Sequence, residues 1–137
     1  MQIQPYLFFD GRCEEALDFY KAAAGAKVEM LMRFKENPDR GKGGMEPPGA
    51  DDKVMHAAFK IGDTMILASD GNCTGKPKFD GFSLAVSVKD EAEADKTFAG
   101  LGKGGEINMP LAKTFFSPKF GMVRDKFGVN WMVMVGA

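Results

Sequence analysis

The opening residues change from an apolar run to a helical pattern. Residues 5–9 (PYLFF) are apolar and aromatic, which is typical of a strand buried on both faces. Asp10-Gly11 interrupts this run, and Glu14 and Glu15 then place negative charge where it stabilises a helix N-terminus. Apolar residues recur at helical spacing until Gly25, a residue that commonly ends helices. The pattern predicts a strand, a turn and a helix.

Three further strands are expected in the first half of the chain. They cover residues 28–35, 53–60 and 64–69, and Gly62-Asp63 can join the last two by a tight turn. This turn would place His56 opposite Ser69, Ala58 opposite Leu67 and Lys60 opposite Met65 on one sheet face. Residues 36–52 are rich in Gly, Pro and charge. Such a long loop fits either a binding lid or a disordered segment.

The second half repeats this order of elements. It contains a strand over 82–88, a helix that runs from a capping box at Asp90 and Glu93 to Leu101, and three more strands. These strands cover residues 106–112, 119–124 and 129–135. A shift of 77 residues lays Leu7 on Leu84, Cys13 on Asp90, Asp18 on Asp95 and Gly25 on Gly102. We therefore expect an α+β fold with two β-α-β-β-β modules, 1–70 and 80–137, in one domain of 137 residues.

Composition and charge exclude several classes of partner. The net charge is −1 and the basic residues form no cluster, so nucleic acid and acidic membranes have no electrostatic attraction to the chain. Apolar runs are too short to span a bilayer, and no secretory signal pattern is present. Cys13 and Cys73 lack any paired spacing, as expected for free thiols. The sequence thus predicts a cytoplasmic protein without nucleic-acid or membrane partners.

Four segments resemble a known family. PYLFFDG, ALDFY, HAAFKIGD and DKFGVNW are similar to the PhnB-like branch of the vicinal oxygen chelate superfamily. This superfamily includes glyoxalase I, bleomycin-resistance and fosfomycin-resistance proteins, and extradiol dioxygenases. The resemblance implies a curled mixed sheet around a cavity, formed by both modules, and a homodimer. In enzymatic members it also implies a divalent metal held by His, Glu or Gln.

The resemblance places the four metal-ligand positions within this chain. They fall within Gln4 to Tyr6, at Ile66 or Leu67, at Ser83 and at Met132. Only Gln4 is an ordinary ligand type, so we expect no family metal site and no cofactor, with a metal on other residues as the alternative. The single His56 also excludes a two-His-one-carboxylate iron site within one subunit. Glyoxalase chemistry would need a glutamate where Met132 stands.

Other residues are candidates for binding or catalysis. His56 is the single histidine of the chain and could be an acid-base catalyst, a pocket residue or a structural histidine. Tyr6 and Phe8 share one strand face and could line the cavity or the core. Arg33 and Arg124 could clamp an anion, or could be solvated or paired with acids. Cys13 is expected at the cap position that Asp90 fills in the second module.

These observations favour a binding protein over an enzyme. The expected function is binding of a small-molecule ligand in the sheet cavity without the metal quartet. The expected ligand-binding residues are Gln4, Tyr6, Phe8, Arg33, Leu67, Ser83, Arg124 and Met132. The alternative is a lyase, isomerase or transferase on a small oxygenated or phosphonate-like compound, with His56 as the catalytic residue. A methyltransferase is disfavoured, because the chain has no Gly-rich strand-to-helix turn for a nucleoside cofactor.

Overall fold

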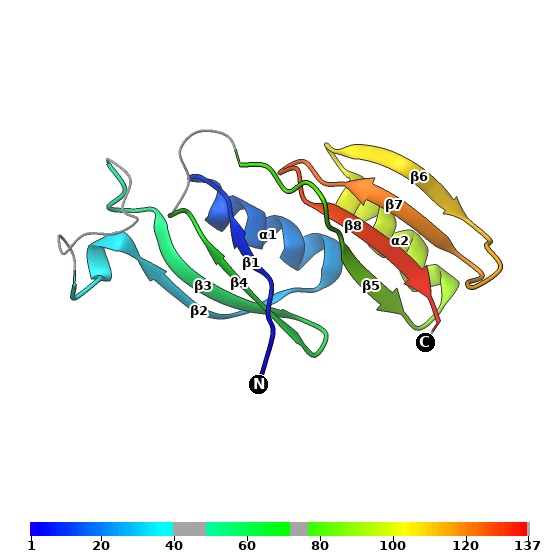
Figure 1. Ribbon diagram of the computed structural model, residues 1–137, viewed down its shortest axis with the longest axis horizontal. Coiled ribbons are helices and arrows are strands. Elements are labelled where there is room, and N and C mark those ends of the chain that lie inside the picture. The colour runs from blue at the N-terminus through cyan, green and yellow to red at the C-terminus, as the bar shows by residue number, and fades with distance from the viewer. Residues whose placement is uncertain (40–48, 72–76, 137) are drawn as a thin grey trace. The chain divides into compact units, whose positions relative to one another are not determined.

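The computed structural model describes residues 1–39, 49–71 and 77–136 (Figure 1). These residues form two compact units, Met1–Pro77 and Lys78–Ala137, which contain the two predicted modules. Each unit combines a four-stranded mixed sheet with one α-helix. The predicted α+β class and the repeated order of elements are therefore confirmed. Part of the predicted 36–52 loop, and Cys73, lie outside the described residues.

The first unit has the strand order β1-β4-β3-β2. Its elements are β1 (Tyr6–Phe8), α1 (Cys13–Ala24), β2 (Lys27–Arg33), the short 3-10 helix η1 (Phe34–Glu36), β3 (Val54–Ile61) and β4 (Thr64–Ser69). Strand β1 runs parallel to β4, and the other neighbours are antiparallel. Because Ile61 pairs with Thr64, the predicted two-residue turn is confirmed, with Gly62 at φ 59°.

Two of the three predicted hairpin pairs are present. Ala58 lies opposite Leu67, and Lys60 lies opposite Met65. The regular ladder ends at the pair of Ala57 and Ala68, before it reaches His56 and Ser69. Beyond it, the Asp70 N–H donates to the Val54 carbonyl oxygen at 2.8 Å, which shifts the register by one residue where β4 ends.

Helix α1 covers one face of this sheet. Leu7 and Phe9 are buried on that face, and the Tyr20 ring stacks on Phe59 with centroids 6.0 Å apart. Tyr6 lies on the other face and is 37% exposed. The expectation of a strand buried on both faces is wrong, because β1 is an edge strand with a helix on one side only.

The N-terminus of α1 is capped by a residue from the end of β4. Cys13 is the first helical residue rather than the cap, and the N-cap, Arg12, makes no capping bond with its side chain. Instead, Asp70 Oδ1 accepts hydrogen bonds from the backbone N–H groups of Gly11 (2.7 Å) and Cys13 (2.8 Å). The prediction that Cys13 occupies the cap position is therefore wrong. Gly25 ends the helix in the left-handed conformation, as expected.

The second unit repeats the topology with the order β5-β8-β7-β6. Its elements are β5 (Leu84–Val88), α2 (Glu91–Gly102), β6 (Glu106–Ala112), β7 (Phe120–Arg124) and β8 (Asn130–Val135). Strand β5 runs parallel to β8, as β1 does to β4. Asp90 Oδ1 accepts a hydrogen bond from the Glu93 N–H at 2.8 Å, which is the predicted N-cap contact. Trp131 is buried and donates through Nε1 to Asp125 Oδ2 at 2.8 Å.

Within the described ranges, neither α1 nor α2 has the length and apolar character needed to cross a membrane.

Candidate functional site

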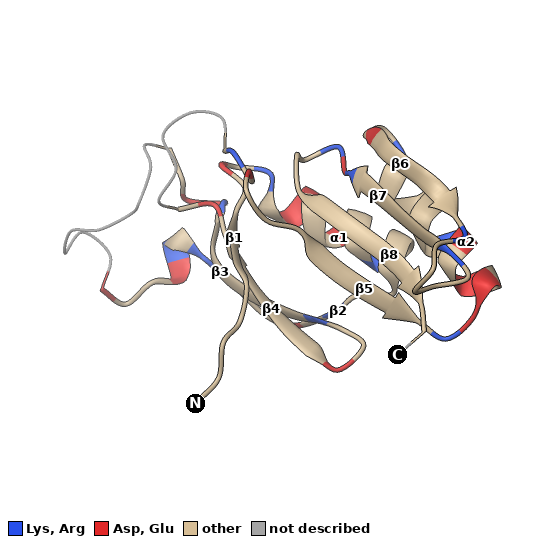
Figure 2. Cartoon of the chain, turned by 45° about the vertical axis from the view of Figure 1, so that its right-hand side comes forward, with Lys and Arg blue, Asp and Glu red and all other residues tan. Residues whose placement is uncertain are grey.

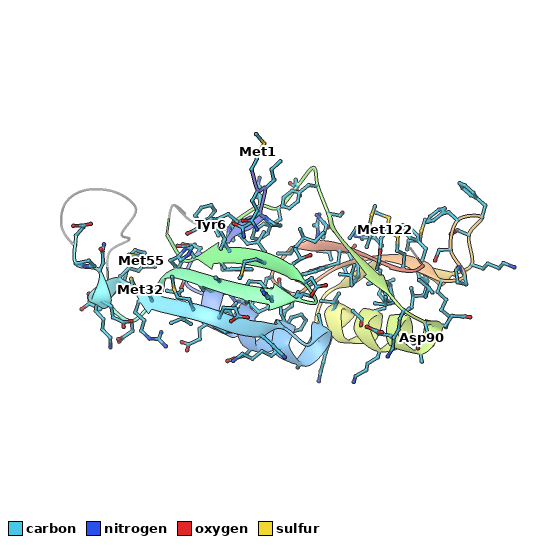
Figure 3. The ribbon with its side chains drawn as sticks, turned by 90° about the horizontal axis from the view of Figure 1, so that it is seen from below. Met1, Tyr6, Met32, Met55, Asp90 and Met122 are labelled. Atoms are coloured by element: carbon cyan, nitrogen blue, oxygen red, sulfur yellow. The ribbon has the colours of Figure 1, made fainter. Side chains whose placement is uncertain are left out.

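The first sheet leaves one face without a covering helix, and we call it the open face. Strand register assigns side chains to it, because residues paired across neighbouring strands point to the same side. The open face carries Tyr6, Phe8, Lys27, Met30, Met32, His56, Ala58, Lys60, Met65, Leu67 and Ser69. Figure 3 shows Tyr6 on the side of this sheet opposite α1. Four strands thus bring aromatic, thioether and polar groups onto one surface.

A tyrosine-histidine pair is the main polar feature of the open face. Tyr6 Oη lies 2.9 Å from His56 Nδ1, a hydrogen bond between β1 and β3. The Tyr6 ring also stacks on Phe8, with centroids 4.9 Å apart and an interplanar angle of 20°. Stacking fixes the phenol ring while the hydroxyl reaches the imidazole. The two side chains expected near a cavity are therefore joined on the open face.

The protonation of this pair limits its chemistry. Burial raises the pKa of Tyr6 above its ordinary value of 10.0, so the phenol keeps its proton at neutral pH. When its hydroxyl donates to Nδ1, the neutral imidazole carries its own proton on Nε2 and offers a donor to a ligand. With the other tautomer, the hydroxyl accepts and Nε2 becomes an acceptor. The pair can therefore bind either an acceptor or a donor oxygen.

The remaining predicted positions are divided between the two units. Leu67 lies beside Tyr6 on the open face, whereas Ile66 is buried on the α1 face. Gln4 is half-buried and precedes β1. Ser83 precedes β5, and Met132 lies on the uncovered face of the second sheet, between Ala85 and Met122. Figure 3 shows Met122 on the side of its sheet opposite α2.

Both predicted anion-clamping arginines have acidic partners. The Arg33 guanidinium donates to both carboxylate oxygens of Glu14 at 3.1 and 2.8 Å, and to the Asp52 carbonyl oxygen at 2.8 Å. Arg33 pairs with buried Val54 in the sheet and reaches α1, away from the open face. Arg124 contacts Asp80 at 3.5 Å and donates to Asn130 Oδ1 at 3.2 Å. Ligand binding by either arginine remains a prediction from the sequence.

The donor set does not fit the metal of enzymatic relatives. The positions that the resemblance implies fall within Gln4 to Tyr6, at Ile66 or Leu67, at Ser83 and at Met132, and among these residues only Gln4 is an ordinary metal ligand. Across the part of the chain that the structure describes, no three His, Cys, Asp or Glu side chains cluster closely enough to hold an ion. We therefore derive no chemistry through a metal.

Met30, Met32 and Lys27 were not identified as site residues from the sequence. They belong to β2, whose register contains a bulge between Val28 and Met30. Strict alternation from Lys27 would have put Met30 on the α1 face. Because of the bulge, the sequence alone does not show that Lys27 and Met30 lie on the same face of the sheet. The two-residue spacing of Met30 and Met32 is the signal that could have placed these two together.

Comparison with known proteins gives full-length matches. The family model described as 3-demethylubiquinone-9 3-methyltransferase matches residues 1–134. Protein YjdN of Escherichia coli strain K12 is 34% identical over 98% of this chain and 95% of its own length. The structure of protein PA1353 from Pseudomonas aeruginosa is 38% identical, with a TM-score of 0.84 over 98% of this chain and 97% of that one.

Two further structures relate the fold to a superfamily. A putative 3-demethylubiquinone-9 3-methyltransferase, PhnB protein, from Bacillus cereus is 31% identical, with a TM-score of 0.81 over 99% of this chain and all of that one. A glyoxylase/bleomycin resistance protein/dioxygenase domain from Frankia sp. EAN1pec is 18% identical and has a TM-score of 0.68 over 100% and 98% of the two chains. The latter likeness concerns the fold alone.

Proposed function

Because this chain belongs to the PhnB-like branch of the vicinal oxygen chelate superfamily, the family described as 3-demethylubiquinone-9 3-methyltransferase, we propose that it binds a small molecule on the open face without a resident metal. The ligand has a flat apolar body and at least one oxygen. The observation that carries this proposal is the hydrogen bond of 2.9 Å between Tyr6 Oη and His56 Nδ1 within an apolar surface.

The composition of the open face supports this assignment. Ligand sites are mostly apolar and contain a few polar groups that fix orientation. Here Phe8, Met30, Met32 and Leu67 supply apolar contact, and methionine adapts its shape to different ligands. Met30 is 42% exposed, so apolar surface remains for a ligand to cover. The name of the family and of the Bacillus cereus relative refers to a quinone, a flat ring with oxygens, which this surface would accept.

Binding can be tested with p-coumaryl alcohol, an uncharged phenol. Amide NMR spectra of the full chain should show saturable shifts in β1, β3 and β4, with a Kd roughly between micromolar and millimolar for so small a compound. Tyr6→Phe and His56→Gln should each weaken binding about fivefold, the expected effect of one lost hydrogen bond. Met122→Leu, on the second sheet, is the matched control and should not change the Kd. Absence of saturable shifts on the open face, both with this alcohol and with the related acids described below, would refute the proposal.

Catalysis by His56 is the second candidate, since Tyr6 and His56 form a donor-acceptor pair suited to proton transfer. General-base activity can be tested with phenylpyruvate in deuterated water, by following exchange at the carbon beside its ketone. A base role predicts faster exchange with the wild-type protein than with His56→Gln. Equal rates for the two proteins would remove this candidate and leave ligand binding unaffected.

Methyl transfer is not our proposal, despite the name of the family. Nucleoside cofactors commonly use free amides at the start of a helix that follows a strand. At the start of α1, the amides of Gly11 and Cys13 already donate to Asp70 Oδ1. Saturable binding of S-adenosylmethionine to the purified protein would contradict this conclusion.

We also propose that the protein is a homodimer. Several large apolar side chains of the second unit are exposed, including Phe115 (100%), Phe116 (53%) and Ile107 (55%). Exposed apolar groups of this kind commonly mark protein interfaces. Light scattering coupled to gel filtration should give twice the mass of the chain, and Phe115→Ser with Phe116→Ser should lower it toward one chain. A monomeric wild-type protein would contradict the proposal.

A further inference from the structure

We propose that the ligand of the open face is an anion whose acidic group is bound by Lys27 and Lys60. This inference rests on the proposed function, because it names the chemical class of the molecule bound there. The acidic group is a carboxylate or a phosphonate, both of which present oxygen atoms to an ammonium group. The apolar body then lies over Ala58, and its other end reaches Tyr6 and His56.

The two lysines lie directly opposite each other on adjacent strands. Lys27 of β2 pairs with Lys60 of β3, and Lys60 also pairs with Met65 of β4. Their neighbours Val28 and Phe59 form the next pair, and Phe59 is buried against α1, so both lysines point to the open face. Like charges directly opposite one another destabilise a sheet. An anion placed between them would relieve this repulsion.

Neither lysine has a carboxylate partner within residues 1–39, 49–71 and 77–136. Glu29, in the bulge of β2, and Asp63, in the β3-β4 turn, are the acids nearest in sequence, and neither forms an ion pair with these lysines. Arg12, Lys21, Arg33, Lys35, Lys119 and Arg124 have acidic partners, whereas some other lysines, among them Lys103 and Lys113, form no ion pair with a described residue either. The lysine pair on the open face is therefore available to an anion from solution.

The remaining charge on the open face is consistent with this ligand class. No Asp or Glu belongs to the residues that register pairing places there, and Glu29, the exposed bulge residue beside Met30, is the acid of β2 nearest to Lys27 in sequence. Figure 2 shows that the strands of the sheet are mostly free of charged residues, which lie mainly in helices and loops. The lysine pair and His56 are the groups on this face that can carry positive charge.

The spacing along β3 defines the shape of the ligand. His56 and Lys60 are four residues apart on one strand, about 13 Å at the usual rise of a strand. Ala58 lies midway on the same face, between Met30 and Leu67, and has a small side chain. An extended planar molecule with an oxygen at one end and an acid at the other matches this arrangement.

p-Coumarate has this shape, and related compounds remove one end at a time. p-Coumaryl alcohol lacks the acid, cinnamate lacks the phenol, and styrylphosphonate replaces the carboxylate of cinnamate by a phosphonate. Wild-type protein should bind p-coumarate about tenfold more tightly than p-coumaryl alcohol, as expected for a charge-assisted contact. The relative affinities of cinnamate and styrylphosphonate decide which acid is preferred.

Variants test the lysines directly. Lys60→Met and Lys27→Met should each weaken p-coumarate binding about fivefold and leave p-coumaryl alcohol unaffected. Lys60→Arg should retain the preference for the acid, and Lys113→Met, which removes a charge from the second unit, should have no effect.

These experiments distinguish failure of the anion inference from failure of the proposed function. If p-coumaryl alcohol binds the open face as tightly as the acids do, and the lysine variants change nothing, the anion inference is wrong and the proposed function stands. If none of the four compounds shifts open-face amides, both proposals are wrong.

Discussion

The carboxylate of Asp70 accepts a hydrogen bond from the backbone N–H of Cys13 at 2.8 Å, although the two residues are 57 positions apart. The same oxygen accepts from Gly11, and Asp70 Oδ2 accepts from the Val54 N–H at 3.0 Å. Asp70 is buried. One side chain therefore joins the start of α1, the start of β3 and the end of β4, which are the elements that position Tyr6 and His56.

Replacement of this carboxylate should strongly destabilise the first unit. Asp70→Ala leaves three backbone N–H groups without their acceptor, and we expect a loss of about 3 kcal/mol or more in the free energy of unfolding. Urea denaturation followed by circular dichroism measures this loss. Asp90→Ala removes a conventional N-cap on α2 and should cost only about 1 kcal/mol. Equal losses for the two variants would show that Asp70 is an ordinary cap.

Alanine substitutions at Gly121 and Gly102 of the second unit should have different effects on stability, because Gly121 is the more closely packed of the two. A Cβ on Gly121 would lie 2.7 Å from the Phe98 ring and 3.0 Å from the Met109 carbonyl oxygen, so Gly121→Ala should destabilise by about 1–3 kcal/mol. At Gly102, the last residue of α2, the nearest atom would be at 3.4 Å. Gly102→Ala should be neutral or stabilise by up to about 1 kcal/mol, since alanine favours helices. Thermal unfolding of both variants measures the difference, and destabilisation by Gly102→Ala would contradict the packing argument.

Cys13 should make stability fall at alkaline pH. Burial, followed by the charge of Asp70, raises the thiol pKa far above its ordinary value of 9.0. The unfolded chain releases this proton as pH rises through 9.0, whereas the folded chain keeps it, so deprotonation favours unfolding. Between pH 8 and pH 10, the wild-type protein should lose about 1.4 kcal/mol more than Cys13→Ala does. Both proteins should carry Cys73→Ser to prevent oxidation. Parallel pH profiles would show that the thiol ionises without unfolding.

The sequence predicted most of the fold because burial imposes local periodicity. The Gly62-Asp63 turn located the β3-β4 hairpin, the spacing of apolar residues located α1, and the capping box at Asp90 and Glu93 located α2. The cap of α1 could not be predicted, since Asp70 reaches it from the end of a distant strand. The sequence showed that Tyr6 and Phe8 share one strand face, but the bond to His56 depends on β4 lying between β1 and β3. The local pattern of apolar and polar residues does not reveal the order of strands in the sheet.

The partner of Arg33 also could not be predicted from the local sequence, and the role of this residue can be tested. Its position at a strand end suggested an anion clamp, but its guanidinium pairs with Glu14 on the α1 side of the sheet. Arg33→Gln should therefore leave the Kd for p-coumarate unchanged, in contrast to Lys60→Met. NMR titration of the two variants measures this contrast. A loss of fivefold or more in Arg33→Gln would place the arginine in the binding site.

Ligand binding should be independent of divalent metals. The positions that the resemblance implies, within Gln4 to Tyr6, at Ile66 or Leu67, at Ser83 and at Met132, include Gln4 as the only ordinary ligand type, and thioether or aliphatic groups do not hold hard or borderline ions. Protein dialysed against EDTA should bind p-coumaryl alcohol with the same Kd as protein supplied with zinc, nickel or manganese. Elemental analysis of the untreated protein is the control and should find far less than one metal ion per chain. A stoichiometric metal, together with weaker binding after EDTA treatment, would contradict the metal-free site and make Gln4 the first ligand to test by substitution.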